Sequence, residues 1–598
     1  MRSTLLSRRD LDFLLYEWLD VEGLTKRTRF AEHSRETFDG VLDLAEQIAT
    51  RYFATHNKKN DAHEPTFDGK TVTIIPEVAQ ALAAFAKADL LGITMDEEFG
   101  GAQVPHTVGT ASFAWFQAAN VGTSGYPFLT LGNANLLLAH ASPEQIDTFV
   151  RPMIEGRFFG TMCLSETQAG SSLADVTTRA EPSTDGTYRL FGSKMWISGG
   201  EHDLSENIVH LVLAKIPGSP PGTKGISLFI VPKFLVQPDG SVGPHNDVVL
   251  AGLNHKMGFR GTTNTVLNFG EGQFTPDGEP GAVGYLIGEA NRGLSYMFHM
   301  MNEARLGVGL CATALGYTGY LKSLDYARTR LQGRSPLAKD PTAQQVPITA
   351  HADVKRMLLA QKSYVEGALA MVLYCSRLVD FEKTAESEEE HRQQGLLLDI
   401  LTPIAKSWPS QWCLEANSLA IQVHGGYGYT REYDVEQHYR DNRLNPIHEG
   451  THGIQGLDLL GRKVVAQSGA SLAALGTKIG GTIGAAQEVG GELSDLAAQL
   501  DSSWQRLVST TAAMFGSGDI EAALANSSVY LETFGHIVIA WIWLEQMLAT
   551  EGRTGDFYDG KRQAGRYFFA FELPKTGPGL DLLARLDRTA LDMQDAWF

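Results

Sequence analysis

The stretch Ile208-Val-His-Leu-Val-Leu-Ala-Lys215 decides the fold class, because it is apolar over a length typical of a buried β-strand. A second apolar run, Gly225-Ile-Ser-Leu-Phe-Ile-Val231, is followed by Pro232, and a shorter run, Tyr188-Arg-Leu-Phe191, is followed by Gly192. Short strands repeated between Gly and Pro turns are typical of a small β-barrel or sandwich. We therefore predict a β-barrel-like domain over residues 158–287.

The sequence on both sides of this domain has helical periodicity. Residues 76–91 begin with proline, place apolar residues three or four apart and are followed by Gly92. A Gly-, Ala- and Ser-rich stretch at 468–491 indicates a hinge or closely packed helices. The sequence thus predicts an α+β multidomain protein with an N-terminal α-helical domain, the middle β-domain, a C-terminal α-helical bundle and an additional helical domain, at residues 1–157, 158–287, 288–467 and 468–598.

One segment of the additional domain is apolar on nearly every face of a helix. It runs from Tyr530 to Leu548 and includes Trp541 and Trp543. A helix of this kind is buried on all sides, so we expect it to pack against the main bundle or a neighbouring subunit. Its most apolar part, residues 536–544, is too short to span a bilayer, and we therefore expect no integral membrane segment.

Charge and cysteine usage narrow the function classes. The 598 residues contain 50 Lys and Arg against 69 Asp and Glu, a net charge of −19. An acidic surface repels phosphate backbones, which argues against nucleic acid as the main partner. The four cysteines lie far apart and form no CxxC pair, so the sequence indicates neither a zinc knuckle nor a disulfide framework, and it fits a reducing cytoplasm.

The N-terminus contains Ser7-Arg8-Arg9, which has the twin arginine of an export signal. Such a signal continues into an uncharged apolar stretch, but here Asp10 and Asp12 follow at once. A cytoplasmic location is therefore the favoured prediction.

Two short motifs suggest other kinds of site. Residues 307–312 match GxGxxA, the dinucleotide fingerprint, which should follow a strand; here helical sequence precedes it, and small residues that let helices approach are the favoured explanation. His448-Glu449-Gly450-Thr451-His452 matches the HExxH pattern of zinc peptidases, which requires a helix. Pro446, Gly450 and Gly453 disfavour that helix, so we predict no metal site here.

The same segment is better interpreted as a carboxylate on a loop. A buried glutamate with a raised pKa can act as a general base and remove a proton from carbon. Glu449 is therefore a candidate base, and a structural salt bridge is the alternative.

Three further segments place hydroxyls and glycines at the ends of regular elements. They are Met162–Ser171, Lys194–Gly200 and Gln422–Tyr429. Backbone amides at such turns can hold phosphate, and a Trp beside a Ser can flank a planar ring. Tight turns at strand ends and a plain helix C-cap are the alternatives.

Taken in order, these motifs resemble one family. The series CLSE…AGS, KMWIS-GG, a helix with Arg305, then Arg330, Q-x-x-GG-x-G and EGT is similar to that of the acyl-CoA dehydrogenases, over about residues 70–465. The resemblance implies a helical domain, a middle β-domain and a C-terminal four-helix bundle, with FAD as cofactor. The length, an insertion near 339–346 and the added C-terminal unit resemble a large branch that includes 3-methylmercaptopropionyl-CoA dehydrogenases and bacterial fatty acyl-CoA dehydrogenases.

The resemblance also implies roles for individual residues. The flavin ring would contact Leu164, Ser165, Trp196 and Ser198, and Ser171 would touch the FAD phosphates or the CoA pantetheine. Across a subunit interface, FAD would be reached by Arg330, Gln422 and Gly426, and Thr451 would contact its phosphates or adenosine. The substrate would lie along Asn302, Arg305, Gly450 and Ser171.

The implied reaction is the α,β-dehydrogenation of an acyl-CoA thioester to trans-2-enoyl-CoA, as in fatty acid β-oxidation. Some family members carry the base immediately before the helix arginine, but that position is Ala304 here, which leaves Glu449 as the predicted base. Glu303 is turned about 100° away on a helix. Glu449 would remove the α-proton while the β-hydrogen leaves as hydride to flavin N5.

The implied partners are an electron-transferring flavoprotein as electron acceptor and further copies of the chain, in a homodimer or tetramer. Three alternatives remain open at this point. The first is a dehydrogenase that acts on 3-methylmercaptopropionyl-CoA. The second is a nucleic-acid-associated flavoprotein of the same fold, and the net charge and the presence of Glu449 argue against it. The third is a zinc peptidase that uses His448 and His452.

Overall fold

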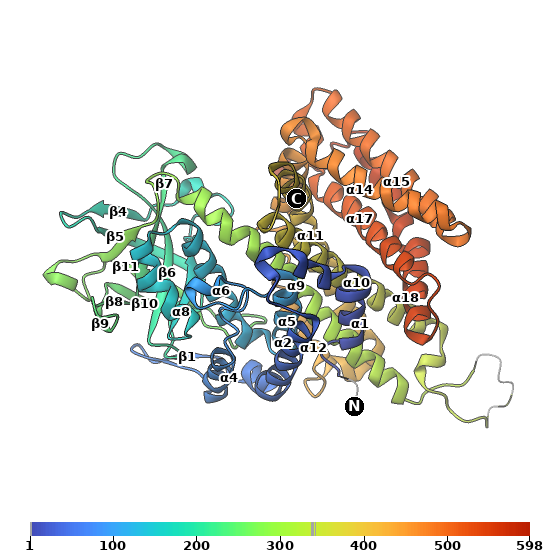
Figure 1. Ribbon diagram of the computed structural model, residues 1–598, viewed down its shortest axis with the longest axis horizontal. Helices are drawn as coiled ribbons and strands as arrows, with labels where there is room; N and C mark the ends of the chain where they lie inside the picture. Colours follow the sequence, from blue (N-terminus) through green and yellow to red (C-terminus); the bar gives the residue numbers. More distant parts are fainter. Residues whose placement is uncertain (1–2, 336–339, 341) are drawn as a thin grey trace. The chain divides into compact units, whose positions relative to one another are not determined.

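The computed structural model of the chain describes residues 3–335, 340 and 342–598 (Figure 1). The insertion predicted near 339–346 lies partly outside these residues. The chain divides into two compact units. The sheet unit comprises Arg35–Pro105 and Trp115–Ala304, and the helical unit comprises Met1–Ser34, His106–Ala114 and Arg305–Phe598. The sequence-based limits divide the chain into four continuous domains, whereas these two units are each made of separate segments. Those domain limits remain a prediction.

The sheet unit is built around an eight-stranded sheet with the order β10-β11-β5-β12-β7-β6-β3, in which β4 pairs with β5 and β6. The predicted run 208–215 lies in β6, whose side chains are buried up to Ala214, and β6 pairs with β7 in antiparallel register from Val209↔Pro232 to Lys215↔Ile226. The strands are β3 Phe158–Cys163, β4 Arg179–Pro182, β5 Tyr188–Ser198, β6 Asn207–Lys215, β7 Ile226–Pro232, β10 Val248–Leu253, β11 Asn264–Phe269 and β12 Ala282–Leu286. Two small hairpins add β1 Thr66–Phe67, β2 Val72–Thr73, β8 Phe234–Val236 and β9 Val242–His245.

Helices cover this sheet. The helix α6, Val121–His140, contributes Leu136 and Leu137 to a core that also contains Phe158 and Leu211 of the sheet, so the apolar faces of helix and sheet exclude water from each other. The predicted helix at 76–91 is α4, which ends at Lys87, before the glycine. The other helices of this unit include α2 Arg35–Ile48, α3 Asn57–Ala62, α7 Pro143–Gln145, α8 Arg151–Ile154 and the C-terminal part of α5 His106–Ala119.

The helical unit contains a bundle of long helices. Gly307–Ala312 lies within α9, Gly293–Thr329, and not after a strand. A Cβ on Gly309 would come within 2.0 Å of the Ala405 carbonyl oxygen on α11, Glu388–His424, which confirms that the GxGxxA pattern serves close helix packing. The bundle also contains α10 Ala352–Lys383, α12 Val435–Asn442 and α13 His452–Asp458.

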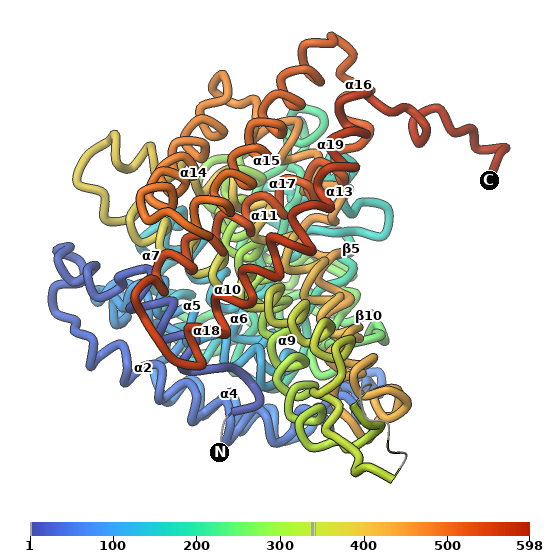
Figure 2. The backbone as a smooth tube through the Cα atoms, turned by 90° about the vertical axis from the view of Figure 1, so that its right-hand side faces the viewer, coloured from blue at the N-terminus to red at the C-terminus, as the bar shows by residue number. Residues whose placement is uncertain are grey.

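The C-terminal segment of the helical unit folds into α14 Ala470–Val489, α15 Gly491–Gly516, α16 Ile520–Ala525, α17 Ser527–Ala549, α18 Asp556–Tyr567 and α19 Thr576–Ala584. Figures 1 and 2 both show α14, α15 and α17 side by side. The helix α17 packs against α10 and α11, because Trp543 Nε1 donates to the Ser363 carbonyl at 3.1 Å and a Cβ on Gly535 would lie 2.6 Å from Trp408. This confirms the predicted packing of 530–548 on the main bundle.

The length and composition of α17 would suffice for a membrane span, and no other helix among the described residues meets that test. However, 83% of its most apolar window is buried within the protein, as is typical of a core helix. This single helix therefore does not indicate membrane insertion.

A buried ionic cluster joins the two ends of the chain inside the helical unit. Lys561 Nζ of α18 lies 2.5 Å from Asp10 Oδ1 of α1, Arg8–Asp12, and 3.0 Å from Glu366 Oε2 of α10. The Tyr317 hydroxyl donates to Asp10 at 2.9 Å, and Lys362 also pairs with Glu366. Removing one charge from such a cluster leaves another charge buried without compensation, which is strongly destabilising.

Candidate active site

Within the sheet unit, a buried lysine holds two predicted flavin-contacting segments together. Lys194 of β5 is fully buried; its Nζ donates to the Leu164 carbonyl at 3.0 Å and pairs with Glu166 Oε1 at 2.9 Å. The Ser165 carbonyl accepts from the Met195 amide at 2.9 Å. Leu164 and Ser165 are thus fixed beside the strand that carries Trp196 and Ser198.

The carboxylate of this pair is strongly stabilised in its charged form. Burial alone would raise the pKa of Glu166, but the Lys194 charge and hydrogen bonds from Thr178 and Thr177 lower it to about 2. The two carboxylate oxygens accept from both the amides and the hydroxyls of these threonines at 2.6 to 3.0 Å. Glu166 therefore has a structural role as a permanent anion.

Trp196 presents an unusual exposed ring. Its backbone has φ of +65°, in the left-handed region that bulky residues rarely adopt, and 59% of the residue is exposed. Ser198, two residues on, is half-buried and its hydroxyl accepts from Asn264 Nδ2 at 3.2 Å. An exposed indole beside the Ser165 segment and a serine hydroxyl offers a flat apolar face with polar edges, which fits a planar ring such as isoalloxazine.

The other predicted residues of the sheet unit are exposed. Ser171 follows Gly170 in a turn after β3, and Asn302 lies on the first part of α9. Glu303, the alternative base, accepts from Asn135 Nδ2 at 3.0 Å and is therefore hydrogen-bonded within this unit.

Within the helical unit, Glu449 lies on the loop between α12 and α13. Its φ is +53° and that of Gly450 is +89°, so the chain turns sharply at this point. Gln455 Nε2 donates to the Glu449 carbonyl at 3.1 Å, and the Thr451 hydroxyl caps α13 by accepting from the Ile454 amide at 3.3 Å. The loop conformation of Glu449 is therefore fixed from its C-terminal side.

The HExxH pattern does not form a helix. His448 and Glu449 precede α13, which begins at His452. The His448 ring lies 3.0 Å from Asn445 Oδ1, whereas His452 lies 3.4 Å from Glu532. The two histidines thus do not share one helix face, which a zinc site of this type requires, and the peptidase alternative is discarded.

A buried lysine that the sequence analysis missed supports this loop. Lys406 of α11 has no exposed surface, and its Nζ donates to the Asn445 carbonyl at 2.8 Å and to the Gly450 carbonyl at 2.7 Å. Burial lowers the pKa of Lys406 to about 7, although the charge of Glu449 opposes the shift. The available signal was a lysine flanked by the apolar residues Ile404, Ala405 and Trp408.

Burial and the neighbouring charges also change the pKa of the candidate base, Glu449. Burial raises the pKa of the Glu449 carboxyl, while the positive charges of Lys406 and Arg305 oppose the shift. Arg305 itself is buried and pairs with Asp458 at 3.1 Å. Glu449 is thus a carboxylate of increased basicity on a fixed loop, which suits proton abstraction.

Arg330 and the glycine-rich segment form a second, exposed part of the helical unit. The Arg330 guanidinium lies 5.4 Å from the ring centroid of Tyr427, next to Gly426. Gln422, Gly426 and Tyr429 are exposed, and a Cβ on Gly425 or Gly426 would meet no atom within 4 Å. Open backbone amides beside a guanidinium fit the binding of a phosphate-bearing cofactor.

The predicted site residues therefore form one set in the sheet unit and two in the helical unit, of which Arg330 and the glycine-rich segment are the second. Leu164, Ser165, Trp196 and Ser198 lie together on the sheet unit, and Glu449, Gly450, Thr451 and Arg305 lie around one loop and its neighbours on the helical unit.

Four sequence models of one family match the chain in order. They are the acyl-CoA dehydrogenase N-terminal domain at 39–157, the middle domain at 161–270, the C-terminal domain at 291–464 and the acetyl-CoA dehydrogenase C-terminal-like domain at 475–594. Together they cover the predicted site residues of both units and the additional C-terminal helices.

Curated relatives agree with these matches. The chain is 34% identical to 3-methylmercaptopropionyl-CoA dehydrogenase of Ruegeria pomeroyi, with 89% of each chain covered. It is 30% identical to the broad-specificity linear acyl-CoA dehydrogenase FadE5 of Mycobacterium tuberculosis, with 99% of each chain covered.

Solved structures share the fold. An acyl-CoA dehydrogenase of Bacillus anthracis complexed with FAD matches with a TM-score of 0.73 at 19% identity, covering 96% of this chain and 91% of that one. ACDH-11 of Caenorhabditis elegans in complex with C11-CoA matches with a TM-score of 0.74 at 18% identity, covering 94% and 89%.

Proposed function

The chain belongs to the acyl-CoA dehydrogenase family and is an FAD-dependent oxidoreductase, and from this premise we propose that it converts a linear fatty acyl-CoA to the trans-2-enoyl-CoA, with Glu449 as the base. The observation that carries the proposal is the environment of Glu449. Its carboxyl has a raised pKa and lies on a loop fixed by Gln455 and Lys406, whereas the other family position for a base is Ala304.

The chain's residues would act on the substrate α-carbon as follows. Glu449 takes the α-proton onto its carboxylate, and its raised pKa increases the driving force for that transfer. Lys406 holds the carbonyls of Asn445 and Gly450, on the two sides of Glu449, so the carboxylate does not have to be ordered during the reaction. A backbone N–H at Glu449 would stabilise the enolate-like thioester oxygen, a contribution of about 3–4 kcal/mol for one such donor.

FAD, when bound, supplies the acceptor for the β-hydrogen. Its ring would be held by Leu164, Ser165, Trp196 and Ser198, and the rest of the cofactor by Ser171, Arg330, Gln422, Gly426 and Thr451. The exposed Trp196 indole and the open glycine-rich segment beside Arg330 support this assignment.

We further propose a cytoplasmic homo-oligomer that passes electrons to an electron-transferring flavoprotein. The exposed residues Leu331, Tyr427 and Tyr429, which are 52%, 49% and 86% exposed, support an interface near Arg330. A 3-methylmercaptopropionyl-CoA substrate is the second candidate, and the relative from Ruegeria pomeroyi favours it.

The test is anaerobic mixing of the FAD-loaded enzyme with straight-chain acyl-CoAs of increasing length and with 3-methylmercaptopropionyl-CoA. Loss of the oxidised-flavin absorbance with the straight chains, together with enoyl-CoA as product, is the expected result. Faster loss with the sulfur-containing substrate than with any straight chain would select the second candidate. No loss with any thioester would contradict both.

A further inference from the structure

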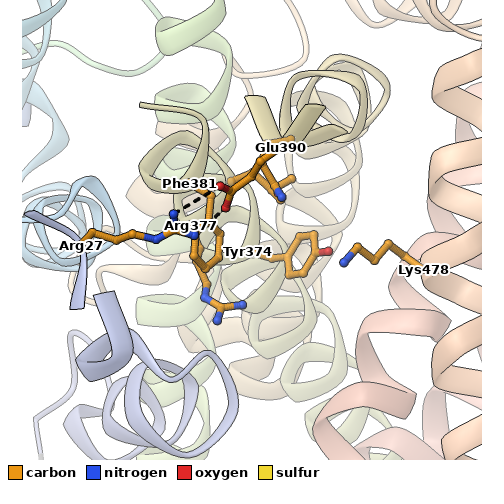
Figure 3. A pocket seen from close by; sticks show the side chains of 8 residues that line it. Arg27, Tyr374, Arg377, Phe381, Glu390 and Lys478 are labelled. Atoms are coloured by element: carbon orange, nitrogen blue, oxygen red, sulfur yellow. Dashed lines mark hydrogen bonds and ion pairs between the residues drawn. The ribbon is translucent and has the colours of Figure 1, made fainter. Parts of the chain in front are cut away.

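A hollow of about 340 Å³ lies within the helical unit, and none of the residues assigned to the flavin or the base lines it (Figure 3). One stripe of α10 forms its main wall, because residues 374, 377, 378 and 381 recur at helical spacing on one face. Its volume is at the small end of the range for ligand pockets. The lining residues are Arg27, Tyr374, Arg377, Leu378, Phe381, Glu390, Gln394 and Lys478.

The hollow has an excess of positive charge. Three cationic side chains line it against one carboxylate. Arg27 is already neutralised, since its guanidinium lies 2.5 Å from Glu390 Oε1 and 3.4 Å from Glu386 Oε1 and also donates to the Thr384 carbonyl at 3.3 Å. The remaining two cations, Arg377 and Lys478, determine what the hollow can bind.

Arg377 makes no ion pair within 4 Å with any residue that the structure describes. Its buried Nε–H has no hydrogen-bond partner among the residues that the structure describes, and its guanidinium lies 4.6 Å from the Phe381 ring centroid. Burial lowers the pKa of Arg377, which is the shift of a cation without a matching anion.

Three carboxylates, Asp20, Asp380 and Glu545, oppose the lowering of the Arg377 pKa. Asp20 is exposed and makes no ion pair with Arg377 within 4 Å, and the other two carboxylates are hydrogen-bonded to other groups. Asp380 accepts from the amides of His106 and Thr107 at 2.6 and 2.9 Å, and Glu545 accepts from Trp18 Nε1 at 3.2 Å. These two carboxylates already have donors of their own, so neither compensates Arg377 directly.

Lys478 of α14 faces Arg377 from the opposite side. The Tyr374 side chain lies between them, with its hydroxyl directed toward Lys478 Nζ (Figure 3). In the described part of the chain Lys478 makes no ion pair, and the amide of Gln394 also borders the hollow. A guanidinium, an ammonium, a hydroxyl and an amide therefore surround one small space.

We propose that this hollow binds a phosphorylated small molecule, with its phosphate oxygens contacting Arg377, Lys478 and the Tyr374 hydroxyl and its uncharged part along Leu378. A guanidinium fork and an ammonium are the usual donors to phosphate oxygens. Because Lys478 lies on α14 and Arg377 on α10, the ligand would join the C-terminal helices to the bundle.

The experiment is calorimetric titration of the FAD-loaded enzyme with pyrophosphate, inorganic phosphate and AMP. Arg377→Gln and Lys478→Gln should each weaken binding on the order of tenfold, because each removes a charge-assisted hydrogen bond. The affinity of Arg377→Lys should lie between those of the wild type and Arg377→Gln, because lysine keeps the positive charge and lacks the two-pronged guanidinium. The matched control is Lys355→Gln, which makes the same charge change on an exposed face of α10 outside the hollow.

Tighter binding of AMP than of pyrophosphate identifies a nucleotide-like ligand, and equal or tighter binding of pyrophosphate identifies a simple phosphate ligand; both support the site. Affinities that do not respond to Arg377→Gln and Lys478→Gln, or the absence of binding at millimolar probe, would overturn it. Lys478 is exposed, so its variant should retain the fold, and the melting temperature and acyl-CoA turnover without the probe should equal those of the wild type.

Discussion

Two glutamates, each with a buried lysine nearby, have opposite properties in the two units. In the sheet unit, Lys194 makes a direct ion pair with Glu166 at 2.9 Å, and the pKa of Glu166 falls to about 2. In the helical unit, Lys406 gives its hydrogen bonds to two carbonyls, and the pKa of Glu449 rises. The same two residue types thus produce a permanent anion in one place and a candidate base in the other. What differs is where the lysine N–H groups point.

The largest effect is expected for Glu449→Gln. The amide keeps the size of the side chain but cannot accept a proton, so the rate of anaerobic flavin reduction by acyl-CoA should fall by about 10²–10⁴. FAD content and melting temperature should be unchanged. Glu303→Gln, the matched control, should stay within a few-fold of the wild-type rate; the reverse order of the two variants would move the base to Glu303.

Glu166→Gln should act on stability. It leaves Lys194 buried without its anion, at a cost of about 3–5 kcal/mol in the free energy of unfolding measured by urea titration. Because the folded pKa of Glu166 lies below its ordinary value of 4.5, its contribution is present above that pH and is lost as the pH falls toward 2. The variant should therefore lose less stability than the wild type between these two values, and equal acid sensitivity would contradict this account.

Lys406→Met should act on the reaction while Glu449 remains. The loop loses its hold on the Asn445 and Gly450 carbonyls, and misplacement of a reacting group by about 1 Å costs on the order of 10² in rate. Since the Lys406 charge lowers the pKa of Glu449, its removal should move the acidic limb of the kcat/KM profile to higher pH. A rate loss with an unmoved acidic limb would assign Lys406 a purely structural role, and Lys406→Arg should recover part of the rate.

Arg330→Ala should have the smallest effect. Loss of one charge-assisted contact to a phosphate should weaken FAD retention by on the order of tenfold, measured as flavin released during dialysis. Lys355→Gln is a control for the loss of one surface charge. Unchanged flavin content in the Arg330 variant would place the cofactor elsewhere than beside the glycine-rich segment.

The features with local causes could be predicted from the sequence. The apolar run 208–215 became the buried strand β6, and proline and glycines around Glu449 prevented the helix that HExxH needs. The position of Lys406 could not be predicted, because its partners Asn445 and Gly450 are some 40 residues away and contribute backbone atoms, which every sequence offers. The hollow could not be predicted either, because Arg27 and Lys478, which both line it, are far apart in the sequence.

The ionic cluster at Lys561 also sets the order in which the protein can be completed on the ribosome. The sheet unit has all of its residues once Ala304 has been made. Asp10 and Glu366, however, receive their common cation only when residue 561 emerges, which at about 5–20 residues per second is on the order of half a minute to two minutes after Asp10 itself. Throughout that interval the first helix is without its final partner, so the helical unit stays unfinished after the sheet unit has all of its residues.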